Sequence, residues 1–325
     1  MTHSFRTVNG ISTVAIETEH GSQSIVDGDK SNYFTEYGMA IIADHVNQDF
    51  AKLHECEVGT LGTLDGKPTI CTRKEFGYNY PGSWLQHDDG SKYTALDNAD
   101  LLTYTCSGNG DYRIWLLEWR YIDMTIPEKA ALYMEQLAAD DSHGYSQDNR
   151  WGVDYDCSSA VIQMYEDAGA PVKTAGATYT GNMRDVFLRC GFVDVTESVS
   201  LNNGDGMKRG DVLLNEIHHT AMYLGNGMIA HASANENGGA HGGKPGDQTG
   251  KEICKRTYYN YPWDCVLRHK DAFDIGDPSE WALESCIKAV NAGIFHGDGD
   301  GNFRWKDGIT REEMAVVLDN VGLLG

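Results

Sequence analysis

The chain is organised around residues 154–164, which read DYDCSSAVIQM. Cys157 follows an acidic, turn-like segment and opens an apolar run with helical spacing, so the pattern predicts a helix that begins at the thiol. The helix dipole and the unpaired backbone N–H groups at a helix N-terminus favour the thiolate, which is the form that attacks a carbonyl carbon. A lone cysteine in such a run is more often a buried structural residue, and downstream residues must decide between the two interpretations.

Residues 208–232 supply the partners that a nucleophilic cysteine needs. They read KRGDVLLNEIHHTAMYLGNGMIAHA, in which two strand-like runs flank a GNG turn and predict a β-hairpin. His219 opens one arm and His231 lies near the end of the other, so antiparallel pairing brings the two rings close. One imidazole can then take the thiol proton of Cys157 while the other orients it, as in nucleophilic catalysis.

These segments resemble the NlpC-like, papain-type peptidases that cut bacterial cell-wall peptides, and among them the phage peptidoglycan amidases. The resemblance covers about residues 126–269 and rests on DYDCSSAV, KRGDVLLN, HHTAMYLGNG, IAHASANENG, GGKPGDQTGKEI and YYNYPWDCVLR. It implies a papain-like α+β domain in which Cys157 is the nucleophile, His219 the base and His231 the orienting residue.

Further residues take roles around this expected site. The resemblance makes Asp156 a supporting partner of the nucleophile and makes the loop that carries Trp151 part of the cleft. Tyr179 is a candidate substrate contact, although Trp151 and Tyr179 could equally serve packing. His218 is the alternative base, but the alternation of side chains along a strand points it to the face opposite His219.

Residues 1–123 predict a mostly-β domain, with short strand-like runs at 14–17, 39–43, 58–64, 69–73, 101–105 and 112–121. His45 ends one of these runs, Cys106 ends a second and Arg113 begins a third. At converging strand ends these side chains could serve as acid/base, nucleophile and oxyanion stabiliser, which makes them a second candidate site.

The order His, Cys, Arg resembles that of the sortase transpeptidases, which are β-barrels. The resemblance covers about residues 10–121, and the separation of 61 residues between His45 and Cys106 (106 − 45) is of the right size. The YTCSG flank departs from the family pattern, and the loop from Cys106 to Arg113 is short. Arg120 is a second candidate for the arginine. The alternatives are a decayed barrel that recognises wall peptide, or coincidence.

Residues 271–325 differ in character from the rest of the chain. One helix is expected to end at Ala292-Gly293, a Gly/Asp-rich turn follows, and Thr310 and Glu313 predict a capping box on a second helix. The segment resembles one S-layer homology module, a family that implies binding to secondary cell-wall polysaccharide, often through three copies. The turn lacks the glutamate that an EF-hand requires at its twelfth position, which is Ile309 when Asp298 is counted first.

Composition excludes several classes of function. A net charge of −22 over 325 residues disfavours nucleic-acid binding, which depends on Lys and Arg contacts to phosphate. We also expect no membrane span and no signal peptide, hence synthesis in the cytoplasm. The eight cysteines have no zinc-ligand spacing, and we expect free thiols, no metal and no cofactor.

Together these patterns predict a multidomain α+β protein. The expected domains are a sortase-like barrel at 1–123, an NlpC-like domain at 124–270 and a small helical S-layer-homology-like module at 271–325. The expected function is that of a phage-type endolysin that hydrolyses peptidoglycan after release from the cell. It would cut either the N-acetylmuramoyl–L-alanine amide or the bond between D-glutamate and the diamino acid. The alternatives are a non-catalytic wall-binding or phage structural protein, and a transpeptidase acting through the N-terminal domain.

Overall fold

The structure is a computed structural model of the 325-residue chain. It describes residues 1–36, 38–81, 84–94 and 99–272, and beyond them 278–279, 282, 285–286, 289–290, 294–295, 303–321 and 323–324. Two compact units divide the chain. The first comprises Met1–Met124, Ala131–Asp156 and Ala230–Lys255, and the second comprises Thr125–Ala130, Cys157–Ile229 and Arg256–Gly325. Among the described residues, none of the helices has the length and apolar character needed to cross a membrane.

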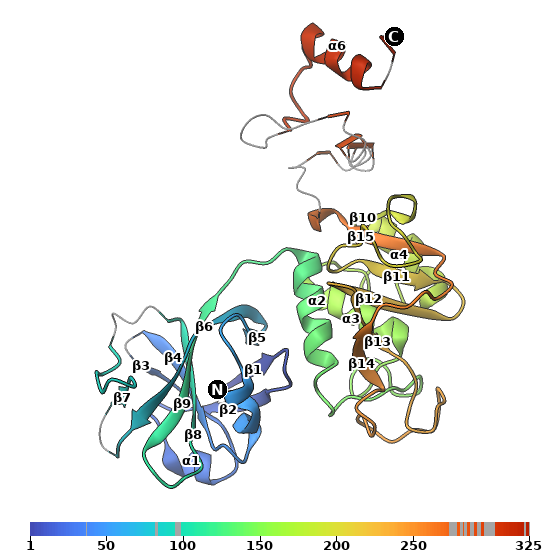
Figure 1. The fold of residues 1–325 in the computed structure, drawn as a ribbon. Coiled ribbons are helices and arrows are strands. Elements are labelled where there is room, and N and C mark those ends of the chain that lie inside the picture. Colours follow the sequence, from blue (N-terminus) through green and yellow to red (C-terminus); the bar gives the residue numbers. More distant parts are fainter. Residues whose placement is uncertain are drawn as a thin grey trace. The chain divides into compact units, whose positions relative to one another are not determined.

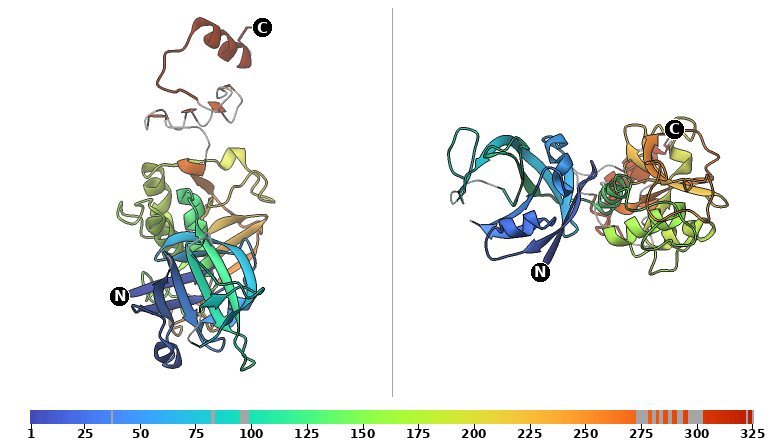
Figure 2. Two further views of the ribbon diagram at one scale, coloured as in Figure 1. Left: turned by 90° about the vertical axis from the view of Figure 1, so that its left-hand side faces the viewer. Right: turned by 90° about the horizontal axis from the view of Figure 1, so that it is seen from below.

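The N-terminal part of the first unit is a closed β-barrel. Its strands run in the order β5-β1-β2-β3-β4-β8-β9-β6-β7, and β5 also pairs with β6, so that the first eight strands of this order form a ring (Figures 1 and 2). Closure leaves no free sheet edge within the ring. The strands are β1 (Thr2–Thr7), β2 (Ser12–Glu17), β3 (Asn32–Glu36), β4 (Met39–Asp44), β5 (Leu61–Leu64), β6 (Lys67–Asn79), β7 (Leu85–Gln86), β8 (Leu101–Cys106) and β9 (Arg113–Tyr121).

The barrel interior is built from alternating apolar side chains. Phe5, Phe50 and Trp119 are fully buried in one cluster, where the Phe5 and Trp119 rings meet edge to face at 5.2 Å. The indole N–H of Trp119 donates to Thr103 Oγ1 at 2.9 Å, so this buried polar group is satisfied. Each strand-like run of the N-terminal sequence overlaps a strand of the barrel, and the expected mostly-β barrel is confirmed.

Two shorter helical segments accompany the barrel strands. Helix α1 (Gln23–Asp27) lies between β2 and β3, and the 3-10 helix η1 (Asp49–Glu55) lies between β4 and β5. Strands β4 and β8 pair in parallel with Ala43 opposite Tyr104 and Asp44 opposite Thr105. This register brings the residues that follow, His45 and Cys106, to the same end of adjacent strands.

The rest of the described chain combines helices with a second sheet. Its strands run in the order β10-β15-β11-β12-β13-β14. The elements are α2 (Ile126–Leu137), α3 (Cys157–Ala168), α4 (Thr180–Arg189), β10 (Phe192–Asp194), η2 (Thr196–Ser198), β11 (Val212–Asn215), β12 (His219–Gly225), β13 (Met228–Ala232), β14 (Ile253–Thr257), β15 (Cys265–His269) and η3 (Lys270–Ala272). The expected helix at Cys157 and hairpin around residues 225–227 are therefore present.

Close contacts within the second unit hold helix α3 in place. Tyr165, which is fully buried on α3, donates a hydrogen bond to the carbonyl oxygen of Gly210 in the turn before β11. Gly210 has a φ of +88°, and a Cβ there would lie 2.5 Å from Cβ of Pro127, so only glycine fits this turn. Helix α3 packs against β12 (Figure 1).

In the C-terminal segment, the structure describes helix α6 (Arg311–Asn320) with the expected cap. The backbone N–H of Glu313 donates to Thr310 Oγ1 at 3.1 Å, and the Glu313 carboxylate accepts from the Thr310 backbone N–H at 2.7 Å. The expected helix end at Ala292-Gly293 and most of the Gly/Asp turn, Asp298 included, lie outside the described residues. The domain boundaries inferred from sequence remain a prediction.

A buried ion pair provides a test of the second unit's stability. Arg268 donates to both carboxylate oxygens of Asp211, at 2.7 and 2.6 Å, and both side chains are almost fully buried. Arg268→Met would leave the Asp211 carboxyl buried without its partner, so we expect a loss of about 3–5 kcal/mol in the free energy of unfolding.

Arg184→Met is the matched control, because Arg184 pairs with Asp194 at 2.7 Å at the surface. We expect that variant to lose about 1 kcal/mol or less. Equal losses in calorimetric unfolding would contradict this ranking.

Candidate active sites

Cys157 is the first residue of α3, and its side chain is buried. Ser158 and Ser159 follow it in the first turn and are also buried. The thiol therefore lies where the backbone N–H groups of the first turn have no intrahelical partner and where the helix dipole favours negative charge. This position suits a sulfur that must carry negative charge during a reaction.

His219 is the first residue of β12, the strand against which α3 packs. Its ring lies 5.6 Å from the ring of Tyr261 and 6.0 Å from that of Trp263, between centroids. Burial among these aromatic rings lowers the pKa of His219 to about 4, because an apolar surrounding disfavours the charged imidazolium. At neutral pH the ring is therefore uncharged and can accept a proton. His218, by contrast, is exposed, and its backbone N–H donates to Asn215 Oδ1 at 2.8 Å.

The other residues predicted for this site are placed as follows. His231 is almost fully buried on β13. Asp156 is buried just before α3, where its carboxylate accepts from Arg150 Nη1 at 2.9 Å. Trp151 has a φ of +81°, and Tyr179 is exposed at the N-cap of α4. The assignment of Cys157, His219 and His231 to a single triad remains a prediction.

The second candidate pair is brought together at one end of the barrel. Cys106 Sγ lies 3.8 Å from His45 Nδ1, within hydrogen-bond distance for sulfur. The parallel register of β4 and β8 explains this proximity, because His45 follows β4 directly where Cys106 ends β8. Residues 61 positions apart in the sequence thus become neighbours in space.

The electrostatics of this pair favour a thiolate and an imidazolium. Burial alone raises the pKa of the Cys106 thiol, but hydrogen bonds from the backbone of Val46, from His45 and from the backbone of Gly108 lower it further than burial raises it. The pKa of His45 is raised, first by its hydrogen bond with Cys106, with burial opposing. Each group therefore stabilises the charged form of the other.

Arg113 does not join this pair, contrary to the expectation from sequence. Its guanidinium pairs with Asp88 at 2.7 Å and lies over the rings of Phe76 and Tyr78, 4.3 Å from each centroid. The register explains the difference. Cys106 pairs with Ile114 in the β8–β9 ladder, so Arg113, one position earlier, points to the opposite face of the sheet.

Arg120, the other arginine considered, is also too far away to stabilise an oxyanion at Cys106. It lies on the same face of the sheet as Ile114, because the two are an even number of positions apart on β9. Six residues of extended strand place it about 20 Å further along the sheet, at roughly 3.3 Å per residue. The oxyanion donor expected from sequence is therefore supplied by neither arginine in this arrangement.

A cavity of about 620 Å³ opens on the face of the sheet that carries Cys106. Ala43 and Tyr104 line it and lie opposite each other in the β4–β8 ladder, and Tyr104 lies two positions before Cys106 on β8, hence on the same face. Its walls include the aromatic side chains Phe34, Tyr80, Trp84 and Tyr104. Glu36 also lines it, and burial raises the pKa of that carboxyl. Its volume suits a peptide-sized group, although neither Cys106 nor His45 lines it.

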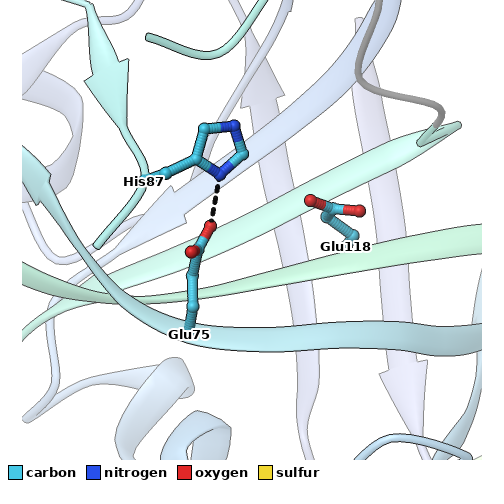
Figure 3. A group of neighbouring side chains, drawn as sticks. All are labelled: Glu75, His87 and Glu118. Carbon is cyan, nitrogen blue, oxygen red and sulfur yellow. Dashed lines mark hydrogen bonds and ion pairs between the residues drawn. The ribbon is translucent and has the colours of Figure 1, made fainter. Parts of the chain in front are cut away.

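Glu75, His87 and Glu118 form a cluster that could hold a metal ion (Figure 3). One ligand atom from each residue lies within 4.8 Å of those of the other two. Carboxylate oxygens and an imidazole nitrogen form a donor set that suits Zn²⁺. The cluster is already neutralised in part, because Arg73 pairs with Glu75 at 3.2 Å and with Glu118 at 3.4 Å. His87 Nδ1 contacts Glu75 Oε1 at 2.8 Å. The sequence gives no sign of this cluster because its members are 12 and 31 positions apart (87 − 75 and 118 − 87).

Asp27 is a further residue that the sequence did not indicate. It is the last residue of the five-residue helix α1, and its Oδ1 lies 3.1 Å from His45 Nε2. An aspartate before a glycine, with no periodic pattern around it, has no signature that distinguishes it from a turn residue. Only the folded chain brings it to His45.

Comparison with known proteins relates most of the chain to one family. Residues 104–228 and 229–286 match the family described as endolysin-like domain, and residues 276–315 match the S-layer homology domain. No curated protein matches. Similar solved structures include three sortases. They are sortase C from Clostridium perfringens SM101 (TM-score 0.27, 11% identity, 37% of this chain and 69% of that one), a sortase from Actinomyces oris (0.28, 14%, 37% and 82%) and sortase E1 from Streptomyces coelicolor with a tripeptide in the active site (0.29, 10%, 38% and 89%).

The low pKa of His219 gives a prediction that NMR can check. With a pKa of about 4, the ring of His219 takes up its proton below pH 5, so its ring ¹⁵N shifts should stay constant from pH 5 to 8. Trp263→Ala should open the aromatic surrounding to water and raise the midpoint toward the ordinary value of about 6.5. A midpoint already near 6.5 in the parent protein would contradict the burial that the structure assigns to this ring.

Proposed function

The chain belongs to the endolysin-like domain family, and from this membership we propose that it is a cysteine-dependent hydrolase of bacterial peptidoglycan. The observation that carries the proposal is the placement of Cys157 at the start of α3 and of His219 at the start of β12, two elements that pack together. A buried thiol at a helix N-terminus and an uncharged imidazole on the adjoining strand are the two components of nucleophilic acyl transfer.

The proposed reaction proceeds in two steps. His219 takes the proton of the Cys157 thiol, the sulfur attacks the carbonyl carbon of an amide, and a C–S bond forms. The C–N bond then breaks, and the leaving amine receives the proton from His219. A water molecule next attacks the thioester, with His219 again accepting the proton, and the carboxylic acid and the free thiol are released. The backbone N–H of Cys157 is the proposed oxyanion donor.

Other residues support this reaction in the proposal. His231, as the third member of the predicted triad, would orient the ring of His219. Asp156 forms an ion pair with Arg150, and this pairing would fix the segment immediately before Cys157, where the helix starts. The bond cut is the N-acetylmuramoyl–L-alanine amide or the bond between D-glutamate and the diamino acid, as in the NlpC-like and phage amidase families that the sequence resembles.

The C-terminal match supports the choice of substrate. An S-layer homology domain at residues 276–315 suggests attachment to cell-wall polysaccharide. An anionic chain with a net charge of −22 gains little from general attraction to an anionic wall, so a specific binding module would be needed to bring it there. In this proposal the protein is a phage-type lysin that acts on the wall after its release from the cell.

Cys157→Ala tests the proposal directly. We expect a folded protein whose clearing of purified bacterial walls falls by about 10³-fold or more, because the nucleophile is absent. His219→Ala should give a loss of similar size. Cys190→Ala is the matched control, since Cys190 is another thiol of the second unit, at the C-cap of α4, and should retain parent activity. Unchanged clearing by Cys157→Ala would rule out this function, and mass spectrometry of the fragments identifies the bond.

The contact between Cys106 and His45 favours a second candidate function, a transpeptidase that acts through the N-terminal barrel. It would form a thioester on Cys106 and transfer the acyl group to an amine instead of water.

With a wall peptide and an amine acceptor, Cys106→Ala should abolish the joined product while Cys157→Ala retains it. Loss in Cys157→Ala alone would exclude the barrel as the catalyst. The non-catalytic alternative is supported if the parent protein neither clears walls nor forms the joined product while both variants still bind walls. Deletion of residues 271–325 should then abolish wall binding.

A further inference from the structure

We infer that Asp27 is a positioning residue that orients His45 toward Cys106, so that the barrel holds a Cys–His–Asp relay in place of the Cys–His–Arg arrangement expected from sequence. The inference deepens the second candidate function and is independent of the hydrolase proposed for Cys157. All three residues belong to the first compact unit.

The geometry forms a line of three groups through one imidazole. Asp27 Oδ1 lies 3.1 Å from His45 Nε2, and Cys106 Sγ lies 3.8 Å from His45 Nδ1. A neutral imidazole carries one N–H and one lone pair, on its two different nitrogens. If the carboxylate of Asp27 accepts the Nε2–H, the Nδ1 lone pair faces the thiol and can take its proton. The carboxylate therefore selects the tautomer that the reaction requires.

Both ends of this relay are held by further contacts. Gln23 Nε2 donates to Asp27 Oδ1 at 2.8 Å within α1, and Gln48 Nε2 donates to the Val26 carbonyl at 3.2 Å, which ties the end of α1 to the loop after His45. The backbone N–H of His45 donates to Asp44 Oδ1 at 2.7 Å. The Asp27 carboxylate and the backbone of His45 are thus each held by a partner outside the relay.

The charged groups around His45 favour its imidazolium form. Asp27, Asp44 and Cys106 are the titratable groups that face the ring, from α1, β4 and β8. The pKa of Asp27 is lowered, first by the Gln23 hydrogen bond and then by His45, so the carboxylate keeps its charge at neutral pH. Because Asp27 is exposed, solvent screening limits its effect to a modest share of the rise in the pKa of His45.

The backbone beside Cys106 favours the thiolate without a contribution from Arg113. The backbone amides of Val46 and Gly108 both lower the pKa of the Cys106 thiol. Gly108 has a φ of +80°, a conformation that glycine adopts without strain. Arg113 is held by Asp88 on the other face of the sheet, where it cannot contact a carbonyl bound at Cys106.

The relay performs a balanced acyl-transfer step. The Cys106 sulfur attacks the carbonyl carbon of an amide, the C–S bond forms and the C–N bond breaks, and His45 gives its Nδ1 proton to the leaving amine. An amine or water then attacks the thioester and gives its proton to His45. In this proposal the acyl donor occupies the cavity of about 620 Å³ that Tyr104, two positions before Cys106, helps to line. Asp27 gains no proton at any stage, and it acts by stabilising the imidazolium.

Alkylation of Cys106 measures the relay without a known substrate. Iodoacetamide reacts with the thiolate, forming a C–S bond and releasing iodide, and peptide mass spectrometry assigns the product to Cys106 among the eight cysteines. In the full-length protein we expect a pH midpoint below the ordinary thiol value of about 8.5. His45→Ala should raise the midpoint to about that value. Asp27→Asn should move it part of the way in the same direction and slow alkylation at pH 7 by about threefold.

Asp29→Asn is the matched control. Asp29 is an exposed aspartate two residues beyond Asp27, and its φ of +61° suits asparagine, so this variant should reproduce the parent profile. If Asp27→Asn also reproduces the parent while His45→Ala shifts the midpoint, the Cys–His pair stands and the role of Asp27 is overturned. If His45→Ala leaves the midpoint unchanged, the pair itself is wrong, and the second candidate function fails with it. Circular dichroism of each variant confirms that the barrel is folded.

Discussion

The packing of helix α3 against strand β12 is the contact on which the chemistry of the second unit depends. The helix begins at Cys157 and the strand begins at His219, so the proposed pairing of thiol and imidazole depends on this packing. A hydrogen bond from Tyr165 to the Gly210 carbonyl oxygen links the helix to the turn before β11. The buried ion pair between Asp211 and Arg268 then fixes that turn to β15.

The two candidate sites differ in the electrostatics of their histidines. His219 lies among aromatic rings that hold its pKa near 4, so in the proposed reaction it acts on Cys157 as an uncharged base. His45 has a raised pKa and lies beside a thiol whose pKa is lowered, so each group stabilises the charged form of the other. A neutral base suits proton abstraction during the attack, whereas an ion pair provides a reactive thiolate in advance. The two sites should therefore respond differently to pH.

Local patterns predicted the elements that carry these residues. Helical spacing after Cys157, the GNG turn and the alternating runs before His45 and Cys106 all gave the right element type, because each is an effect of nearby residues. Strands β1 and β3 were missed, since THSFRT and NYFTE contain too few apolar residues to stand out in a single sequence. Their strand character depends on the barrel that surrounds them.

The errors at the N-terminal site arose from register and from distant pairing. A shift of one residue in a strand reverses the face of a side chain, and the motif around Cys106 does not fix the register that turns Arg113 toward Asp88. Asp27 and the cluster of Glu75, His87 and Glu118 depend on contacts between residues far apart in the chain. Such contacts have no local signature, so only the folded chain shows them.

Trapping the covalent intermediate is the most direct test of the central claim, that Cys157 is the nucleophile of a wall hydrolase. The parent protein is mixed with purified wall peptide, quenched in acid within milliseconds to seconds, and digested for mass spectrometry. The proposed mechanism predicts a thioester adduct on the peptide that contains Cys157, with the mass of the acyl fragment. Hydrolysis that proceeds with no adduct on Cys157, or with an adduct on another cysteine, would contradict it.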